Sequence, residues 1–153
     1  MIEKLFIDTW GWIVILNKRE PLHQEVNRLY KKVRLDDGTI YTTDYVLDET
    51  WTLLFRRLPA AVAIKAMSII NDAVSQEYLA IEWIYRERFE RAKELRLKFR
   101  DKPEISFTDL TSMVVMKELG LKSVLTNDDH FIHVGMGLKK VPFNKQNIIN
   151  KTS

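Results

Sequence analysis

Short apolar runs alternate with longer helical segments along this chain, and this alternation constrains the fold more than any other feature. Residues 2–8, 77–81 and 123–126 are apolar and only a few residues long, which is typical of buried strands. Residues 39–42 and 139–142 are candidates for two further short strands. The intervening segments carry apolar residues at helical spacing: 10–16, 22–33, 43–58, 60–74, 85–102 and 107–119. Strands that alternate with helices predict a parallel sheet with helices on both faces.

Local signals mark where several of these helices begin and end. Thr43 and Ser106 are placed to cap the helices that follow them, because their hydroxyls can accept a hydrogen bond from a free N–H of the first turn. Pro59 separates two helices, since proline cannot continue the first one. Gly120 suits the left-handed position that closes a helix. The segment 36–38, Asp-Asp-Gly, predicts a turn.

Composition limits the class of protein. The chain has no repeat, low-complexity tract or linker, so its 153 residues are expected to form one domain at 1–143, with a polar tail at 144–153. The absence of cysteine excludes disulfides, thiolate catalysis and cysteine-bound zinc, and it is compatible with a reducing cytoplasm. No apolar stretch approaches the ~20 residues of a membrane span, so we expect a soluble, cytoplasmic protein without membrane contact.

The charge pattern has two interpretations. The net charge is +3 and the pI is about 9.1, and arginine and lysine are concentrated in segment 85–102. A basic surface of this kind can hold a polyanion such as RNA. The same residues can form a solvated helix face, with pairs at four-residue spacing between Glu82 and Arg86, Glu87 and Arg91, and Glu94 and Lys98.

Four acidic residues occupy positions from which their carboxylates can converge. Asp8 and Asp128 follow predicted strands, and ligands of open parallel sheets bind beyond the carboxyl ends of the strands. Asp109 lies in the first turn of a predicted helix, and Glu49 would have to point inward from another. Each has an ordinary explanation: Asp109 could form a capping box with Ser106, Asp128 an Asx-turn, and Glu49 helix surface. Together they predict one acidic pocket, of the kind that binds hard divalent cations.

Four fragments of the chain resemble the PIN-domain nucleases, and most closely their VapC-type toxin branch: FIDTW, YVLDETWTLL, SFTDLTSMVVMKELG and LTNDDHF. The resemblance implies a three-layer α/β/α sandwich around a central, mostly parallel sheet of four or five strands. It also implies that Asp8, Glu49, Asp109 and Asp128 are the catalytic residues and bind Mg²⁺ or Mn²⁺. Whether the site holds one metal ion or two stays open.

Supporting roles are expected for neighbours of these acids. Thr9 and Thr126 can hold carboxylates in place through their hydroxyls, and Ser106 can order the start of the helix that carries Asp109. The family often has a second acid two positions after the Asp128 equivalent, but here His130 stands there and the extra acid is Asp129.

Two residues could suggest zinc instead. His130 and His133 are three positions apart, but with no cysteine and no other histidine nearby we do not expect a zinc site.

The expected function is therefore metal-dependent hydrolysis of RNA by the toxin of a VapBC-type pair. The resemblance implies a small antitoxin protein as partner, and a homodimer. The apolar helices at 10–16 and 60–70 could supply an interface, although burial in the core explains them equally well. Alternatives are a housekeeping RNA-processing nuclease, or a catalytically silent RNA- or protein-binding module on the same fold. A phosphotransfer domain is disfavoured, because Trp10 stands where such domains need a second aspartate.

Overall fold

The computed structural model describes residues 2–142 and contains one five-stranded sheet. The elements in chain order are β1 (Lys4–Ile7), α1 (Thr9–Leu16), α2 (His23–Leu35), β2 (Thr39–Thr43), α3 (Asp44–Arg57), α4 (Ala60–Ser75), β3 (Leu79–Glu82), α5 (Arg86–Lys98), α6 (Phe107–Leu119), β4 (Ser123–Leu125), α7 (His130–His133) and β5 (Lys139–Val141). All neighbouring strands are parallel, in the order β3-β2-β1-β4-β5.

The strand order reverses next to β1. The chain moves outward from β1 through β2 to β3, then crosses back to β4 on the other side of β1 and ends at β5. Crossovers between parallel strands are right-handed, so connections that run in opposite directions place their helices on opposite faces of the sheet. The point between β1 and β4 is therefore the switch point, where open α/β sheets bind ligands.

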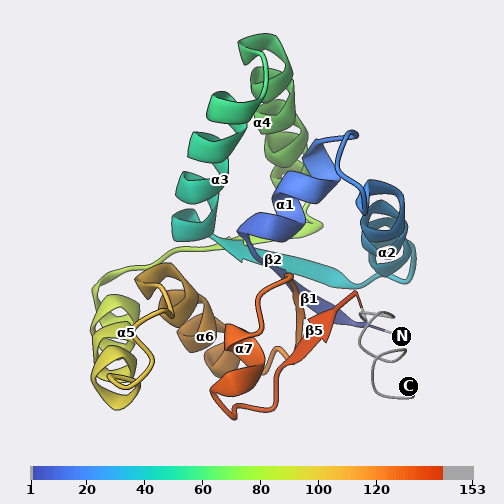
Figure 1. The fold of residues 1–153 in the computed structure, drawn as a ribbon. Coiled ribbons are helices and arrows are strands. Elements are labelled where there is room, and N and C mark those ends of the chain that lie inside the picture. Colours follow the sequence, from blue (N-terminus) through green and yellow to red (C-terminus); the bar gives the residue numbers. More distant parts are fainter. Residues whose placement is uncertain (1, 143–153) are drawn as a thin grey trace, which may run out of the picture.

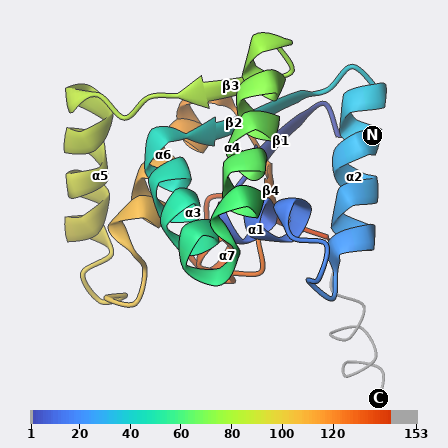
Figure 2. The same ribbon diagram turned by 90° about the horizontal axis from the view of Figure 1, so that it is seen from above.

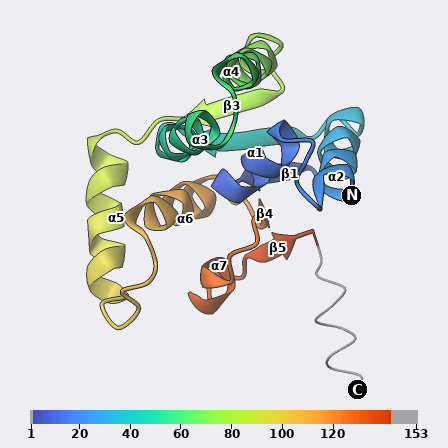
Figure 3. The same cartoon turned by 45° about the horizontal axis from the view of Figure 1, so that its top comes forward.

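The views agree with this two-sided arrangement. In Figure 1, α1, α3 and α4 lie above the sheet, whereas α6 and α7 lie below it. Figures 2 and 3 show α2 and α5 at opposite ends of the molecule, with α5 standing outside α6. The molecule is thus an α/β/α sandwich, as expected.

The core is built on the central strands and on α6. Leu5, Phe6 and Ile7 of β1 are fully buried, as are Val124 and Leu125 of β4. Such continuous apolar runs are typical of parallel strands that are covered on both faces. Helix α6 is buried at every position from 109 to 116, because it lies between the sheet and α5.

Helix α1 packs unusually close to the switch point, at Gly11. A Cβ atom at Gly11 would lie 2.8 Å from Cγ2 of Ile7 and 2.8 Å from the carbonyl oxygen of Leu125. Only glycine allows this approach. The start of α1 therefore packs directly against the ends of β1 and β4, and Asp8 lies at this contact.

Most sequence predictions of elements are confirmed, including both short candidate strands. The capping predictions also hold: the hydroxyl of Thr43 accepts the N–H of Val46, that of Ser106 accepts the N–H of Asp109, and Gly120 ends α6 with a φ of 67°. Two differences remain. Helix α5 ends at Lys98 rather than just before Pro103, and the short helix α7 was not predicted.

The predicted tail at 144–153 lies outside the described residues. Between residues 2 and 142, none of the helices combines the length and the apolar composition that crossing a bilayer requires.

Candidate active site

The carboxyl ends of β1 and β4 meet in a network organised by Thr126. The backbone N–H of Asp8 donates to the carbonyl oxygen of Leu125 at 3.2 Å, which continues the strand pairing by one residue. The hydroxyl of Thr126 donates to Oδ2 of Asp8 at 3.0 Å and accepts the N–H of Asp128 at 3.1 Å. One buried hydroxyl therefore fixes both acids that follow the central strands.

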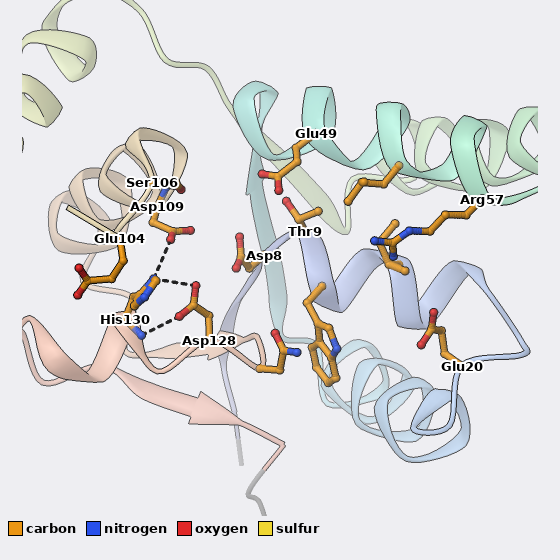
Figure 4. A pocket seen from close by; sticks show the side chains of 14 residues that line it. Asp8, Thr9, Glu20, Glu49, Arg57, Glu104, Ser106, Asp109, Asp128 and His130 are labelled. Carbon is orange, nitrogen blue, oxygen red and sulfur yellow. Dashed lines mark hydrogen bonds and ion pairs between the residues drawn. The ribbon is translucent and has the colours of Figure 1, made fainter. Parts of the chain in front are cut away.

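Two helices bring the other predicted acids to the same place. Asp109 lies in the first turn of α6, where the Ser106 cap orders the backbone, and its side chain is 11% exposed. Glu49 lies on α3, and Figure 4 shows its carboxylate directed toward Asp8. The structure thus places all four predicted carboxylates around one open cavity of about 370 Å³, here called the acidic cavity.

The tightest cluster in the acidic cavity includes a residue that the sequence did not assign to it. Nδ1 of His130 lies 3.0 Å from Oδ2 of Asp128 and 3.5 Å from Oδ2 of Asp109. One ligand atom from each of these three residues lies within 4.8 Å of the others. Among described residues this is the one such group of three or more histidine or acidic side chains, and it includes neither Asp8 nor Glu49.

Two carboxylates of the acidic cavity, those of Asp8 and Asp109, are held in surroundings that disfavour their charged form. Burial raises the pKa of Asp8 to about 7, and repulsion from Asp109 and, less strongly, Glu49 adds to the shift. The N–H of Thr9 and the hydroxyl of Thr126 partly oppose it. Burial and the neighbouring Asp128 also raise the pKa of Asp109, with His130 and Ser106 opposing. Neighbouring carboxylates whose charged forms repel one another are suited to bind a shared cation, because the cation offsets that repulsion.

The predicted supporting residues separate into two groups. Thr9, Ser106 and Thr126 lie at or next to the acidic cavity, and the buried hydroxyl of Thr9 has no hydrogen-bond partner within the described chain. Asp129 instead points away, with a side chain that is 55% exposed and Oδ1 2.6 Å from Nζ of Lys140. His133 does not line the acidic cavity, so His130 and His133 do not converge there as a zinc pair would.

Other side chains of the acidic cavity have no motif of their own, although Trp10 and Asn127 are next to predicted site residues in the sequence. Its walls also include Trp10, Glu20, Arg57, Glu104 and Asn127. Glu20, Arg57 and Glu104 come from separate turns and a helix end, so only the folded chain brings them to the cavity. For His130 the sequence signal is its position two residues after Asp128, where the family often has a second acid.

The donor set fits a divalent cation. Carboxylate oxygens from four separate segments face one cavity, and an imidazole nitrogen lies among them. Such oxygen-rich sets suit Mg²⁺ and Mn²⁺. The unpartnered hydroxyl of Thr9 and the raised pKa values of Asp8 and Asp109 are further features that a bound cation would satisfy.

Comparisons with known proteins agree with this geometry. The family model for the PIN domain matches residues 5–136. The 23S rRNA-specific endonuclease VapC20 of Mycobacterium tuberculosis, from two strains, is 30% identical over 131 residues, which are 86% of this chain and 94% of that protein.

Solved structures show the same relationship. The crystal structure of M. tuberculosis VapC20, described as a sarcin-ricin loop cleaving toxin, has a TM-score of 0.71, 30% identity, and coverage of 86% of this chain and 95% of that one. VapBC2 from Rickettsia felis, bound to a DNA fragment from its promoter, has a TM-score of 0.66 at 16% identity, covers 92% and 99% of the two chains, and shows the fold alone. The chain therefore belongs to the PIN-domain family.

Proposed function

We propose that this protein is a metal-dependent endoribonuclease and the toxin of a VapBC-type toxin–antitoxin pair. The observation that carries the proposal is the convergence of Asp8, Glu49, Asp109 and Asp128 on one cavity at the switch point of the sheet. A PIN-domain relative that cleaves 23S rRNA, similar over nearly its whole length, supports RNA as the substrate. The proposed location is the cytoplasm, where such a substrate is found.

The residues have distinct tasks in this proposal. Asp8, Glu49, Asp109 and Asp128 hold Mg²⁺ or Mn²⁺ directly or through water, and Thr126 fixes the positions of Asp8 and Asp128. A bound cation lowers the pKa of water and offsets the charge that develops on the phosphate. Asp128, which lies at the cavity wall and is half-buried, orients the attacking water. In the proposed reaction, water attacks the phosphorus and the P–O3′ bond breaks, which leaves a 5′-phosphate and a 3′-hydroxyl.

A second feature supports a protein partner. A groove of about 730 Å³ lies between the end of α1 and α4, and it shares Arg57 with the acidic cavity. Its lining is mainly apolar, and its basic residues are Lys18, Arg19, Arg57 and Lys65. We propose that an amphipathic, acidic segment of the antitoxin binds there.

Homodimer formation, also proposed, is consistent with exposed apolar residues of α4 such as Ile64, which is 59% exposed.

The test compares cleavage of a mixed RNA pool by wild type and Asp8→Asn, purified identically, with Mg²⁺ or Mn²⁺. We expect metal-dependent cleavage by wild type and its loss in Asp8→Asn. Asp48→Asn is the matched control, because Asp48 is exposed on α3 beside Glu49 and does not line the acidic cavity. Equal cleavage by all three proteins, or cleavage that persists in chelator, would contradict the proposal. Light scattering of the same samples measures whether the protein is a dimer.

A further inference from the structure

His130 occupies a position that its hydrogen bonds alone do not explain. Its Nδ1 atom faces two carboxylates from different elements, Asp128 at 3.0 Å and Asp109 at 3.5 Å. A single ring N–H points in one direction and cannot serve both well. An atom that faces two carboxylate oxygens at these separations stands where a ligand of a shared cation would stand.

The separations match a coordination sphere. Ligand atoms at right angles around an octahedral cation, each about 2.1 Å from it, lie roughly 3.0 Å apart. The Nδ1 atom of His130 and Oδ2 of Asp128 are 3.0 Å apart, and all three ligand atoms of the group lie within 4.8 Å of one another. The contact between Nδ1 of His130 and Oδ2 of Asp109, now 3.5 Å, would have to shorten, with Asp109 moving toward both partners, to complete one face of an octahedron.

The local backbone holds the imidazole at this place. The N–H of His130 donates to Oδ1 of Asp128 at 2.9 Å, so the two residues are tied by main chain and side chain together. The next residue, Phe131, is fully buried and anchors α7. Asp129 is turned outward to Lys140, which leaves His130 as the residue after Asp128 that faces the acidic cavity.

We propose that His130 is a direct metal ligand, together with Asp109 and Asp128, and that it makes the site prefer Mn²⁺ over Mg²⁺. This inference rests on the proposed metal-dependent function and adds a nitrogen ligand to it. Mg²⁺ demands oxygen ligands and loses its water reluctantly, whereas imidazole is a ligand of transition-metal ions. Mn²⁺ accepts carboxylate and imidazole together, so replacing one oxygen by nitrogen shifts the preference toward Mn²⁺.

Pulsed electron paramagnetic resonance of the Mn²⁺-loaded protein tests the contact directly. A coordinated imidazole nitrogen gives ¹⁴N modulation, which should disappear when the histidines are labelled with ¹⁵N; this comparison needs no substitution. His130→Gln should abolish the modulation. The matched control is His133→Gln, one turn along α7, exposed and outside the acidic cavity, which should retain it.

Calorimetry tests the preference. The ratio of Mn²⁺ to Mg²⁺ affinity should fall by on the order of tenfold in His130→Asp, because a carboxylate oxygen replaces the nitrogen ligand that Mg²⁺ disfavours. His133→Asp should leave the ratio unchanged. Thermal melts in chelator establish that each variant is folded.

The outcomes separate this inference from the proposed function. Mn²⁺ binding that Asp109→Asn abolishes, but that gives no ¹⁴N modulation in wild type, would overturn the imidazole ligand and leave the nuclease proposal standing. An unchanged affinity ratio in His130→Asp would overturn the preference for Mn²⁺. Failure of wild type to bind Mn²⁺ at all would overturn both the inference and the metal dependence of the proposed nuclease.

Discussion

Asp8 shows at the scale of one residue how a proposed catalytic position can work against stability. Its carboxylate is 6% exposed and lies near two other acids, so the folded protein holds the charged form poorly. Its pKa is raised from 3.8 to about 7. An acid whose pKa is higher in the folded state favours folding at low pH, and this advantage is lost as the pH rises through 4 to 7.

Without metal, the wild-type protein should therefore become less stable between pH 5 and pH 8. At about 1.4 kcal/mol per pKa unit, ionising Asp8 costs the folded state about 4 kcal/mol over the whole range from about pH 4 upward. About 3 kcal/mol of this falls between pH 5 and pH 8, which corresponds to a melting temperature lower by on the order of 10 °C. Asp8→Asn should flatten this dependence and melt higher at pH 8 in chelator. Thermal melts across the pH range measure the effect.

The control for this experiment is Asp101→Asn. Asp101 is exposed, and Lys102 lowers its pKa, so its removal should leave the slope between pH 5 and pH 8 as in wild type. A slope in Asp8→Asn as steep as in wild type would show that Asp8 is not the group that ionises in this range.

Thr126 is the second residue to which the proposed site assigns an essential role. Thr126→Val keeps the branched shape but removes both the hydrogen bond to Asp8 and the acceptor for the N–H of Asp128. Metal affinity and RNA cleavage should fall ~10–100-fold, the usual result of losing a group that orients metal ligands. Calorimetry and cleavage assays on the folded variant measure the loss.

Thr111→Val provides the comparison. Thr111 is equally buried, on α6, but its hydroxyl donates to the carbonyl oxygen of Thr108 within the helix. Its replacement should leave cleavage nearly unchanged. Equal losses in the two variants would mean that packing near α6, rather than the Thr126 bridge, sets the activity.

At the scale of elements, three arginines of the basic helix α5 have a mainly structural role. Arg88 binds Glu82 at the end of β3 and Glu118 on α6, and Arg91 binds Glu87 and Glu118. Arg96 donates to three backbone carbonyls, those of Phe99, Lys102 and Ile105. These contacts attach α5 to α6 and order the connection that carries Ser106 into the acidic cavity.

Arg96→Lys should consequently reduce stability while leaving the affinity for RNA of the folded protein unchanged. An ammonium group cannot reproduce the planar fork that reaches three carbonyls, and we expect a loss of about 2 kcal/mol in the free energy of unfolding. Arg100→Lys, at the exposed end of the same segment, should cost much less. Denaturant unfolding gives the first quantity, and filter binding of RNA the second. Weaker RNA binding at unchanged stability would show instead that Arg96 contacts the substrate.

Local patterns explain why so much of this fold could be predicted. Apolar runs, helix caps and the Gly120 stop are decided by residues close in sequence, and so are the strand ends that carry Asp8 and Asp128. The partners of charged side chains in ion pairs are not decided by sequence spacing alone. Glu87 and Arg91 pair as expected, but Glu82 binds Arg88 rather than Arg86. Which of Asp129 and His130 faces the acidic cavity likewise depends on the orientation of α7, and the sequence of this four-residue helix does not determine that orientation.

At the scale of the whole molecule, the modest net charge of +3 conceals an uneven distribution. Carboxylates gather in the acidic cavity, and several cations of α5 already pair with acids of α5 itself, of β3 and of α6. Arg57, in contrast, lines the acidic cavity and also the adjacent groove that holds Lys18, Arg19 and Lys65. An RNA strand that enters the proposed site would meet positive charge on this side.

Arg57→Gln should therefore weaken RNA binding, and the slope of log affinity against log salt should become shallower by about 1, because one phosphate contact and its released counterion are lost. Arg91→Gln is the matched control: it removes the same charge from a residue that already pairs with Glu87 and Glu118, so the slope should change little. Both are best measured in an Asp8→Asn background, in which the proposed cleavage does not consume the RNA. A shallower slope for Arg91→Gln alone would place the RNA along α5 instead, and it would restore the interpretation that the basic helix holds the substrate.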